Sequence, residues 1–190
     1  MEKHKRYVLT GAPGSGKTTL LEALQSDQVT CFDEVFRKLF LEAKNRGVDS
    51  PFQDEPLSLS LEIIKGRIAD FEAAPVSKIH IYDRGVHDAI AYLDSIRVDV
   101  PAYLIEICKS HVYDKVFILP PWEDIFRNDK ERIEDFSETE AIHLALVKTY
   151  TLYGMPPIVV PKLSVENVFL LSKINYEQSP RPTEQILGLV

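Results

Sequence analysis

A glycine-rich segment that ends in lysine and threonine lies near the start of the chain, at residues 10–19. It contains an unbroken G-x-x-x-x-G-K-[ST] pattern that begins at Gly11 and includes Lys17. Glycines let the backbone adopt left-handed angles, so successive N–H groups can point into one concavity that binds phosphate oxygens. The lysine ammonium then contacts the β- and γ-phosphates of a nucleoside triphosphate. The pattern therefore predicts a phosphate-binding loop.

We expect this loop to bind ATP, with GTP as the alternative, together with Mg²⁺. The hydroxyl of Thr18, in the first turn of the helix that follows, is placed to coordinate Mg²⁺. The N-terminus of that helix adds its partial positive charge to the site. The residues expected to contact the nucleotide are Gly11, Ala12, Pro13, Gly14, Ser15, Gly16, Lys17, Thr18 and Thr19.

Asp83 is the second candidate ligand of Mg²⁺. It follows an apolar stretch within residues 78–85, which predict a strand and its exit. The carboxyl ends of parallel strands meet at one edge of a sheet, where ligands bind. A carboxylate there can hold Mg²⁺ through water, opposite the Thr18 hydroxyl. The alternative role for Asp83 is to cap the next helix.

Alternating apolar patterns predict the elements that must position these residues. Strands are expected at residues 7–9, 29–32, 78–85, 112–119 and 158–160. Helices are expected at residues 17–25, 34–45, 57–74, 86–96, 101–108, 137–153 and 164–174. Helices between successive strands imply right-handed crossovers. The sequence therefore predicts an α/β fold with a doubly wound five-stranded parallel sheet, in the P-loop layout of nucleoside and nucleotide kinases.

Length and composition favour a single domain. The chain has 190 residues and is 45% hydrophobic, which suffices for one sizeable core. We expect residues 1–175 to form one P-loop kinase-like domain and residues 176–190 to form a polar, less ordered tail. The net charge of -7 argues against a nucleic-acid partner, because such binding depends on cationic surface.

Location and cysteine chemistry can also be predicted. The first strand begins close to Met1, and no apolar run approaches the ~18 residues of a membrane span. We therefore expect no cleaved signal, no membrane span and a cytoplasmic location. Cys31 and Cys108 are too few for a disulfide framework and are expected to be buried thiols.

Four stretches of the sequence resemble one known family. They are GAPGSGKTTL, FDEVFRKL, YDRGVHDAIAYL and VFILPPWEDIFRNDKER, in this order and spacing. They resemble the AAA-domain family of P-loop ATPases and kinases, which includes the ribosylnicotinamide-kinase-like domain of the bacterial NAD regulator and the fly TRPL-translocation-defect protein. The resemblance covers about residues 5–175. It implies a P-loop kinase-like fold that binds ATP or GTP.

The resemblance also suggests which residues contact the phosphoryl acceptor. Arg84 is similar to the arginine of the D-R or E-R pair in deoxynucleoside and thymidylate kinases, which binds the acceptor or the transferring phosphoryl group. Glu34 follows the second predicted strand, in the position where deoxynucleoside-kinase-like enzymes carry a general base. Its neighbour Asp33 could be the base instead, and a helix N-terminus by itself favours a carboxylate at Glu34. Arg37 lies on the same helix face as Glu34 and is expected to orient it or to contact the acceptor.

A charged insert, residues 123–136, follows the fourth predicted strand. Its Arg127 and Arg132 resemble the lid arginines that close over the γ-phosphate and the adenine in nucleotide kinases. Such closure excludes water and so prevents hydrolysis. The alternative is that this charged run is simply a solvent-exposed surface without a lid function.

These residues together predict an ATP- and Mg²⁺-dependent phosphotransferase. The expected partner is a small acceptor: a nucleoside, a nucleotide or a ribosyl compound. Catalysis would consist mainly of positioning and charge neutralisation during in-line transfer. The alternative is a nucleotide-binding switch or regulator that hydrolyses its triphosphate slowly.

Overall fold

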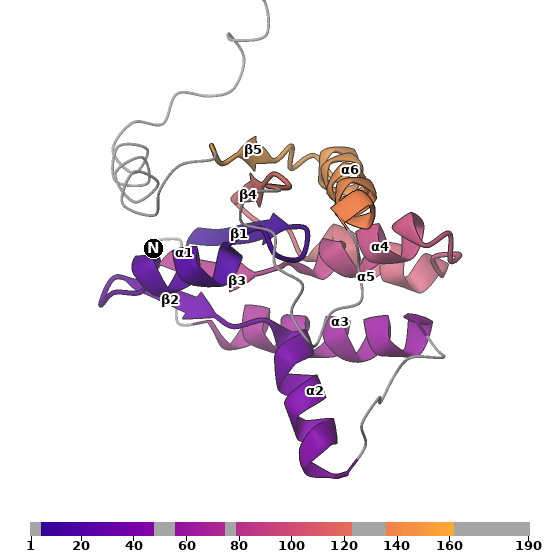
Figure 1. Cartoon of the computed structure of the whole chain (residues 1–190), viewed down its shortest axis with the longest axis horizontal. Helices are drawn as coiled ribbons and strands as arrows, with labels where there is room; N and C mark the ends of the chain where they lie inside the picture. The colour runs from indigo at the N-terminus through magenta and orange to yellow at the C-terminus, as the bar shows by residue number, and fades with distance from the viewer. Residues whose placement is uncertain (1–4, 48–55, 75–78, 123–135, 162–190) are drawn as a thin grey trace, which may run out of the picture.

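The computed structural model describes residues 5–47, 56–74, 79–122 and 136–161, and in these ranges five strands form one parallel sheet (Figure 1). The strands lie side by side in the order β2-β3-β1-β4-β5. Their bounds are β1 Lys5–Gly11, β2 Val29–Phe32, β3 Ile79–Asp83, β4 Lys115–Leu119 and β5 Ile158–Val159. The order places β1, which leads into the glycine-rich loop, at the centre of the sheet.

The described helices connect successive strands, as the sequence predicts. Their bounds are α1 Lys17–Leu24, α2 Val35–Asn45, α3 Pro56–Ala73, α4 Val86–Ser95, α5 Ala102–Ser110 and α6 Phe136–Leu152. The predicted α/β fold with a doubly wound five-stranded parallel sheet is confirmed. No helix in the described ranges is long and apolar enough to cross a membrane. Residues 123–135 of the predicted charged insert, the last predicted helix and the polar tail lie outside the described residues, whereas residue 136 begins α6.

The two faces of the sheet are buried by different helices. In β1, Tyr7 and Leu9 pack with Leu20 of α1, whereas Val8 packs with Leu146 and Tyr150 of α6. Successive side chains of a strand point to opposite faces, so an apolar run such as that of β1 must be covered on both sides. Full burial of each large apolar side chain contributes about 1.5–3 kcal/mol. This two-sided burial fixes the start of the glycine-rich loop.

The fourth strand is shorter than its apolar pattern predicts. It begins at Lys115 rather than at residue 112. The N–H group of Tyr113 donates to the sulfur of Met155, at 3.2 Å, instead of to a neighbouring strand. The N–H group of Asp114 donates to the carbonyl oxygen of Arg6, at 2.8 Å, and the Asp114 side chain accepts from the N–H group of Arg6. With these contacts in place, regular pairing of β4 with β1 begins three residues later than the sequence predicts.

The expectation of two buried thiols is right for Cys108 and wrong for Cys31. Cys108 is fully buried between α3, α4 and α5. Cys31 is only half-buried, because β2 is an edge strand whose four residues are all partly exposed. Burial still raises the pKa of the Cys31 thiol to about 11. Both cysteines are free thiols.

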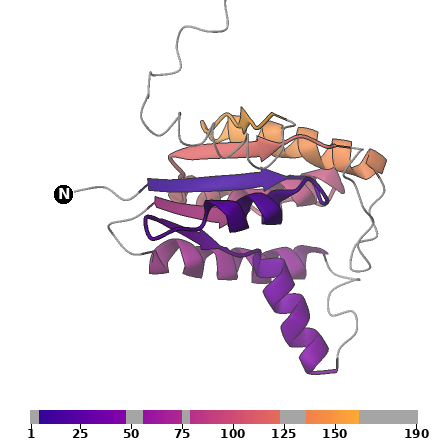
Figure 2. The same ribbon diagram turned by 60° about the vertical axis from the view of Figure 1, so that its left-hand side comes forward.

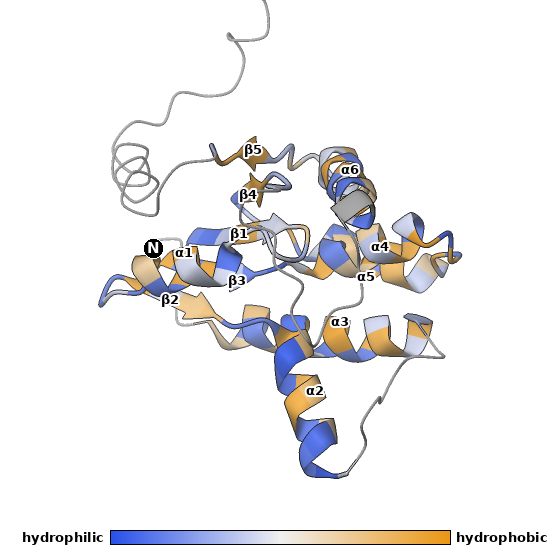
Figure 3. Ribbon diagram, viewed as in Figure 1, coloured by the Kyte–Doolittle hydropathy of each residue, from blue (hydrophilic) through white to orange (hydrophobic). Residues whose placement is uncertain are grey.

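Helix α2 projects away from the sheet, and polar residues cover its far end (Figures 1, 2 and 3). Its first turn is anchored by Val35, which packs closely against Gly66 of α3. A Cβ atom at Gly66 would lie 2.5 Å from a Val35 methyl group, so only glycine permits this approach. The close contact holds the start of α2, and therefore Glu34, beside the sheet.

Candidate active site

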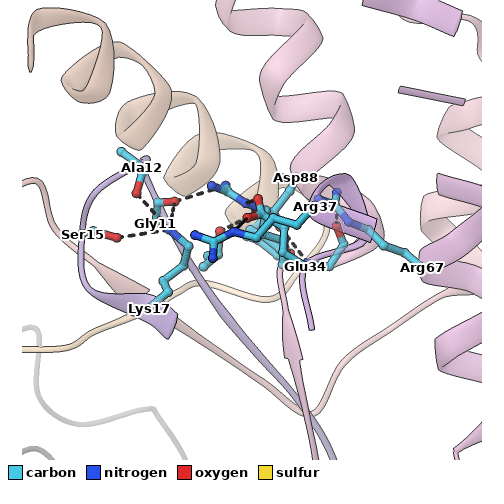
Figure 4. Close-up of polar contacts among 12 residues, drawn as sticks. Gly11, Ala12, Ser15, Lys17, Glu34, Arg37, Arg67 and Asp88 are labelled. Atoms are coloured by element: carbon cyan, nitrogen blue, oxygen red, sulfur yellow. Dashed lines mark hydrogen bonds and ion pairs between the residues drawn. The ribbon is translucent and has the colours of Figure 1, made fainter. Parts of the chain in front are cut away.

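The carboxyl ends of the three strands β1, β2 and β3 bring the predicted site residues together. In the parallel register, Leu9 of β1 lies beside Asp83 of β3, and Phe32 of β2 lies beside Tyr82. The glycine-rich loop, Glu34 and Arg84 therefore leave the sheet at the same edge. In Figure 4, the loop residues surround Lys17, and Glu34, Arg37 and Asp88 form a group next to them.

The loop folds around the ammonium group of Lys17. Gly14 and Gly16 have φ angles of 73° and 87°, in the left-handed region that favours glycine. The Lys17 ammonium donates to the carbonyl oxygens of Gly11 and Ala12, at 3.0 and 2.9 Å, and the residue as a whole is 5% exposed. It also lies 3.2 Å from the hydroxyl oxygen of Ser15. This arrangement places a buried positive charge inside the curve of the loop.

The N-terminus of α1 points into the same curve. Its capping position is Gly16, which has no side chain to satisfy the first N–H groups of the helix. Free N–H groups and the helix dipole make such an end an anion-binding site. Thr18, in the first turn, is partly exposed, and Thr19 is exposed. The loop can therefore offer phosphate oxygens an ammonium, backbone N–H groups and a hydroxyl.

Asp83 fits a metal ligand. Its side chain is 5% exposed, and its Oδ1 atom has no hydrogen-bond partner among the residues that the structure describes. Burial raises the pKa of the Asp83 carboxyl, although the nearby Lys17 ammonium opposes the shift. A buried carboxylate oxygen without a donor is costly unless a cation binds it. Asp83 and Thr18 thus suit Mg²⁺, which prefers oxygen ligands.

Glu34 is a buried carboxylate that two arginines hold. Its Oε1 atom accepts from the Nε atom of Arg84 at 2.6 Å, and its Oε2 atom lies 3.3 Å from the Nε atom of Arg37. Glu34 itself is 6% exposed, whereas its neighbour Asp33 is exposed. The two guanidinium groups thus place positive charge beside the Glu34 carboxylate. The sequence leaves open whether Asp33 or Glu34 is the base. The structure buries Glu34 beside two arginines and leaves Asp33 exposed.

Arg84 connects this carboxylate to the glycine-rich loop. Its Nη1 atom donates to the carbonyl oxygen of Gly11 at 3.2 Å, and the side chain is largely buried. Burial alone would lower the pKa of Arg84, but three carboxylates raise it above its ordinary value: Glu34, Asp88 and Asp83. The guanidinium therefore stays charged between the loop and Glu34.

Arg127 and Arg132 lie outside the described residues. Their predicted role stays a prediction.

Sequence reasoning missed a buried polar cluster beneath Arg84. The carboxylate of Asp88 accepts from the hydroxyls of Thr10 and Tyr150 and from the N–H group of Gly85. The sequence carries two weak signals for it: a threonine in an apolar strand, and an aspartate three residues after a helix N-cap position. Tyr150 lies on an apolar helix face and gives no signal.

Gly85 is required by this cluster. A Cβ atom at this position would lie 2.5 Å from the Tyr150 hydroxyl and 3.0 Å from both Tyr113 and Val8. We expect Gly85→Ala to lower the free energy of unfolding by about 1–3 kcal/mol, as overpacking of a core does. Thermal and denaturant unfolding would measure the loss. In a Tyr150→Phe background the penalty should be smaller, and an equal penalty would show that the hydroxyl contact is not its cause.

Comparisons with known proteins agree with this fold. A family model described as AAA domain matches residues 6–167. A comparison with curated protein sequences found no match. Among solved structures, thymidylate kinase from Ehrlichia chaffeensis is similar, with 17% identity, a TM-score of 0.65, and coverage of 93% of this chain and 100% of that chain.

Two other solved structures are similar as well. Deoxyadenosine kinase from M. mycoides with bound dATP has 16% identity and a TM-score of 0.64, and the match covers 92% of this chain and 100% of that chain. NadR protein in complex with NR has 16% identity and a TM-score of 0.67, and the match covers 95% of this chain and 54% of that chain. At these identities the likeness shows the fold.

Proposed function

Because the chain belongs to the AAA domain family, we propose that it transfers the γ-phosphoryl group of ATP, with GTP as the alternative, to a small acceptor. The acceptor class is a nucleoside, a nucleotide or a ribosyl compound. The fold similarity to proteins named thymidylate kinase and deoxyadenosine kinase supports the proposal. The observation that carries it is the buried Glu34, 2.6 Å from Arg84 and beside the phosphate loop.

On the nucleotide side, the loop residues bind the phosphates. Backbone N–H groups of the glycine-rich loop and the Lys17 ammonium contact the β- and γ-phosphates. Thr18 and Asp83 would hold Mg²⁺, which supplies charge neutralisation on these phosphates. Contacts with loop carbonyls already hold the Lys17 ammonium in place before the nucleotide binds. On binding, the ammonium exchanges these contacts for contacts with phosphate oxygens.

On the acceptor side, Glu34 acts as the general base. It accepts the proton of the acceptor hydroxyl during transfer. Arg84 reaches from Glu34 to the loop and neutralises charge on the phosphoryl group as it moves between them. Arg37 pairs with Glu34 and has a 47% exposed side chain, so it contacts the rest of the acceptor.

An acceptor panel tests the proposal. Purified protein with ATP and Mg²⁺ is incubated with nucleosides, nucleoside monophosphates and ribosyl compounds, and ADP formation is measured with and without each of them. We expect at least one acceptor to raise the rate and to appear as its phosphorylated product. Slow ADP formation at the same rate in every sample would contradict the proposal and indicate the nucleotide-dependent switch instead. Repeating the panel with GTP identifies the preferred donor.

A further inference from the structure

We propose that Asp88 is a positioning residue, which holds the Arg84 guanidinium between Glu34 and the phosphate loop. Asp88 lies in the first turn of α4 and is almost fully buried. It touches neither of the proposed substrates, so it would act through Arg84. Its effect on catalysis rests on the proposed function, whereas its effect on Arg84 does not.

The backbone of Arg84 needs support. Its φ angle is 71°, in the left-handed region that side chains other than glycine rarely adopt. Such a conformation persists only where surrounding contacts enforce it. The N–H group of Arg84 donates to the carbonyl oxygen of Leu9 at 3.1 Å, which fixes one side of the turn. The next residue, Gly85, must fix the other side.

Asp88 supplies that second restraint. Its Oδ2 atom accepts from the N–H group of Gly85 at 3.0 Å, and its own N–H group donates to the carbonyl oxygen of Gly85 at 3.1 Å. Arg67 of α3 donates to the same carbonyl at 2.9 Å. The peptide groups that follow Arg84 are thus held on both sides. The Arg84 side chain must then leave the turn toward the loop.

Asp88 also acts on the Arg84 side chain directly. Its Oδ1 atom lies 3.7 Å from the Nη1 atom of Arg84, the same atom that donates to Gly11. The carboxylate itself is held by the hydroxyls of Thr10 and Tyr150. Burial raises the pKa of the Tyr150 phenol well above its ordinary value, so the phenol stays a donor. Asp88 is therefore a fixed negative charge beneath the guanidinium.

The substitution Asp88→Asn separates this charge from the packing. The Asn carbonyl oxygen can still accept from Gly85 and Tyr150, and the NH₂ group can donate to the Thr10 hydroxyl, which also accepts. The Arg84 guanidinium has only donors, so the NH₂ group cannot replace the lost attraction. The variant should therefore fold and leave Arg84 less tightly held.

Asp94→Asn is the matched control. Asp94 is on the same helix, and its carboxylate pairs with Lys148 of α6 at 2.7 Å. Asp88 and Asp94 thus both join α4 to α6, but only Asp88 lies beside Arg84. A loss caused merely by looser packing of the two helices should appear in both variants.

The deciding measurement is the exchange of the Arg84 Nε–H proton with solvent, followed by ¹⁵N NMR of the protein without nucleotide. Arg84→Lys assigns the signal by removing it. We expect exchange about 10-fold faster in Asp88→Asn, within the range that coupled neighbours show, and unchanged exchange in Asp94→Asn. Equal exchange in Asp88→Asn and in the parent protein would overturn the proposal. If Asp88→Asn does not fold, Asp88→Ser decides by the same criterion, because it removes the charge while its hydroxyl can still accept from the N–H group of Gly85.

Kinetics with the best acceptor of the panel extend the test. Asp88→Asn should lower kcat by about 10-fold with the KM for ATP nearly unchanged, and Asp94→Asn should change neither. A rise in the KM for ATP alone would overturn a role through Arg84. Because the NMR measurement uses no substrate, it still tests the positioning if no acceptor is phosphorylated and the proposed function fails.

Discussion

Replacing Glu34 with Gln should lower kcat for a hydroxyl acceptor by ~10²–10⁴-fold and leave the affinity for ATP nearly unchanged. A hydroxyl must lose its proton during transfer, and a neutral amide cannot take it. The Gln carbonyl can still accept from the Nε atom of Arg84, which now donates to Glu34 at 2.6 Å. The arginine therefore keeps a partner, and the loss reports mainly on the base.

Stability must be measured beside activity for this variant. Removing one charge from a buried ion pair can cost about 3–5 kcal/mol, although Asp83 and Asp88 remain near Arg84 to offset part of that loss. Assays should therefore be done well below the unfolding temperature of the variant.

Asp33→Asn is the matched control for Glu34→Gln. It changes the adjacent carboxylate, which is exposed, and should retain most of the activity. The reverse ranking of the two variants would move the base to Asp33. If both variants phosphorylate a hydroxyl acceptor at the full rate, the proposed base mechanism is wrong. With a phosphate monoester as acceptor, which is already ionised, the Glu34 effect should be small, and substitutions at Arg37 and Arg84 should matter more.

Replacing Lys17 with Ala should weaken ATP binding by roughly 30-fold to several thousand-fold, which corresponds to the ~2–5 kcal/mol lost when a desolvated charge contact is truncated. The structure places this ammonium inside the loop, against Gly11, Ala12 and Ser15. Its loss removes both the positive charge and three contacts that shape the loop. Calorimetry with ATP and Mg²⁺ would measure the affinity, and thermal unfolding would check the fold.

Two further variants separate charge from loop shape. Lys17→Met keeps the aliphatic stem and should bind ATP about as weakly as Lys17→Ala. Ser15→Ala removes one contact of the ammonium but keeps its charge, and it should weaken binding far less. Parent-like ATP affinity in a folded Lys17→Ala protein would refute the phosphate-loop assignment.

Local patterns in the sequence were sufficient for the fold and the phosphate loop. Apolar runs separated by amphipathic helices predict a parallel sheet, because helices that cross over between parallel strands cover both faces of strands such as β1. The glycine-rich segment at residues 10–19 predicts a loop geometry because its glycines permit φ angles of 73° and 87° at Gly14 and Gly16. These are short-range properties, so they can be read from consecutive residues.

Contacts between distant residues were decided by the tertiary structure alone. The sequence leaves both Asp33 and Glu34 as candidates for the base. In the fold, Arg84, 50 residues further on, approaches Glu34 and forms a buried pair with it. Asp88 meets Tyr150 across 62 residues, through the packing of α4 against α6. Neither contact leaves a periodic or compositional trace, since each depends on how whole helices and strands pack. For this reason the phosphate loop can be predicted from the sequence, whereas the contacts around Arg84 are known only from the tertiary structure.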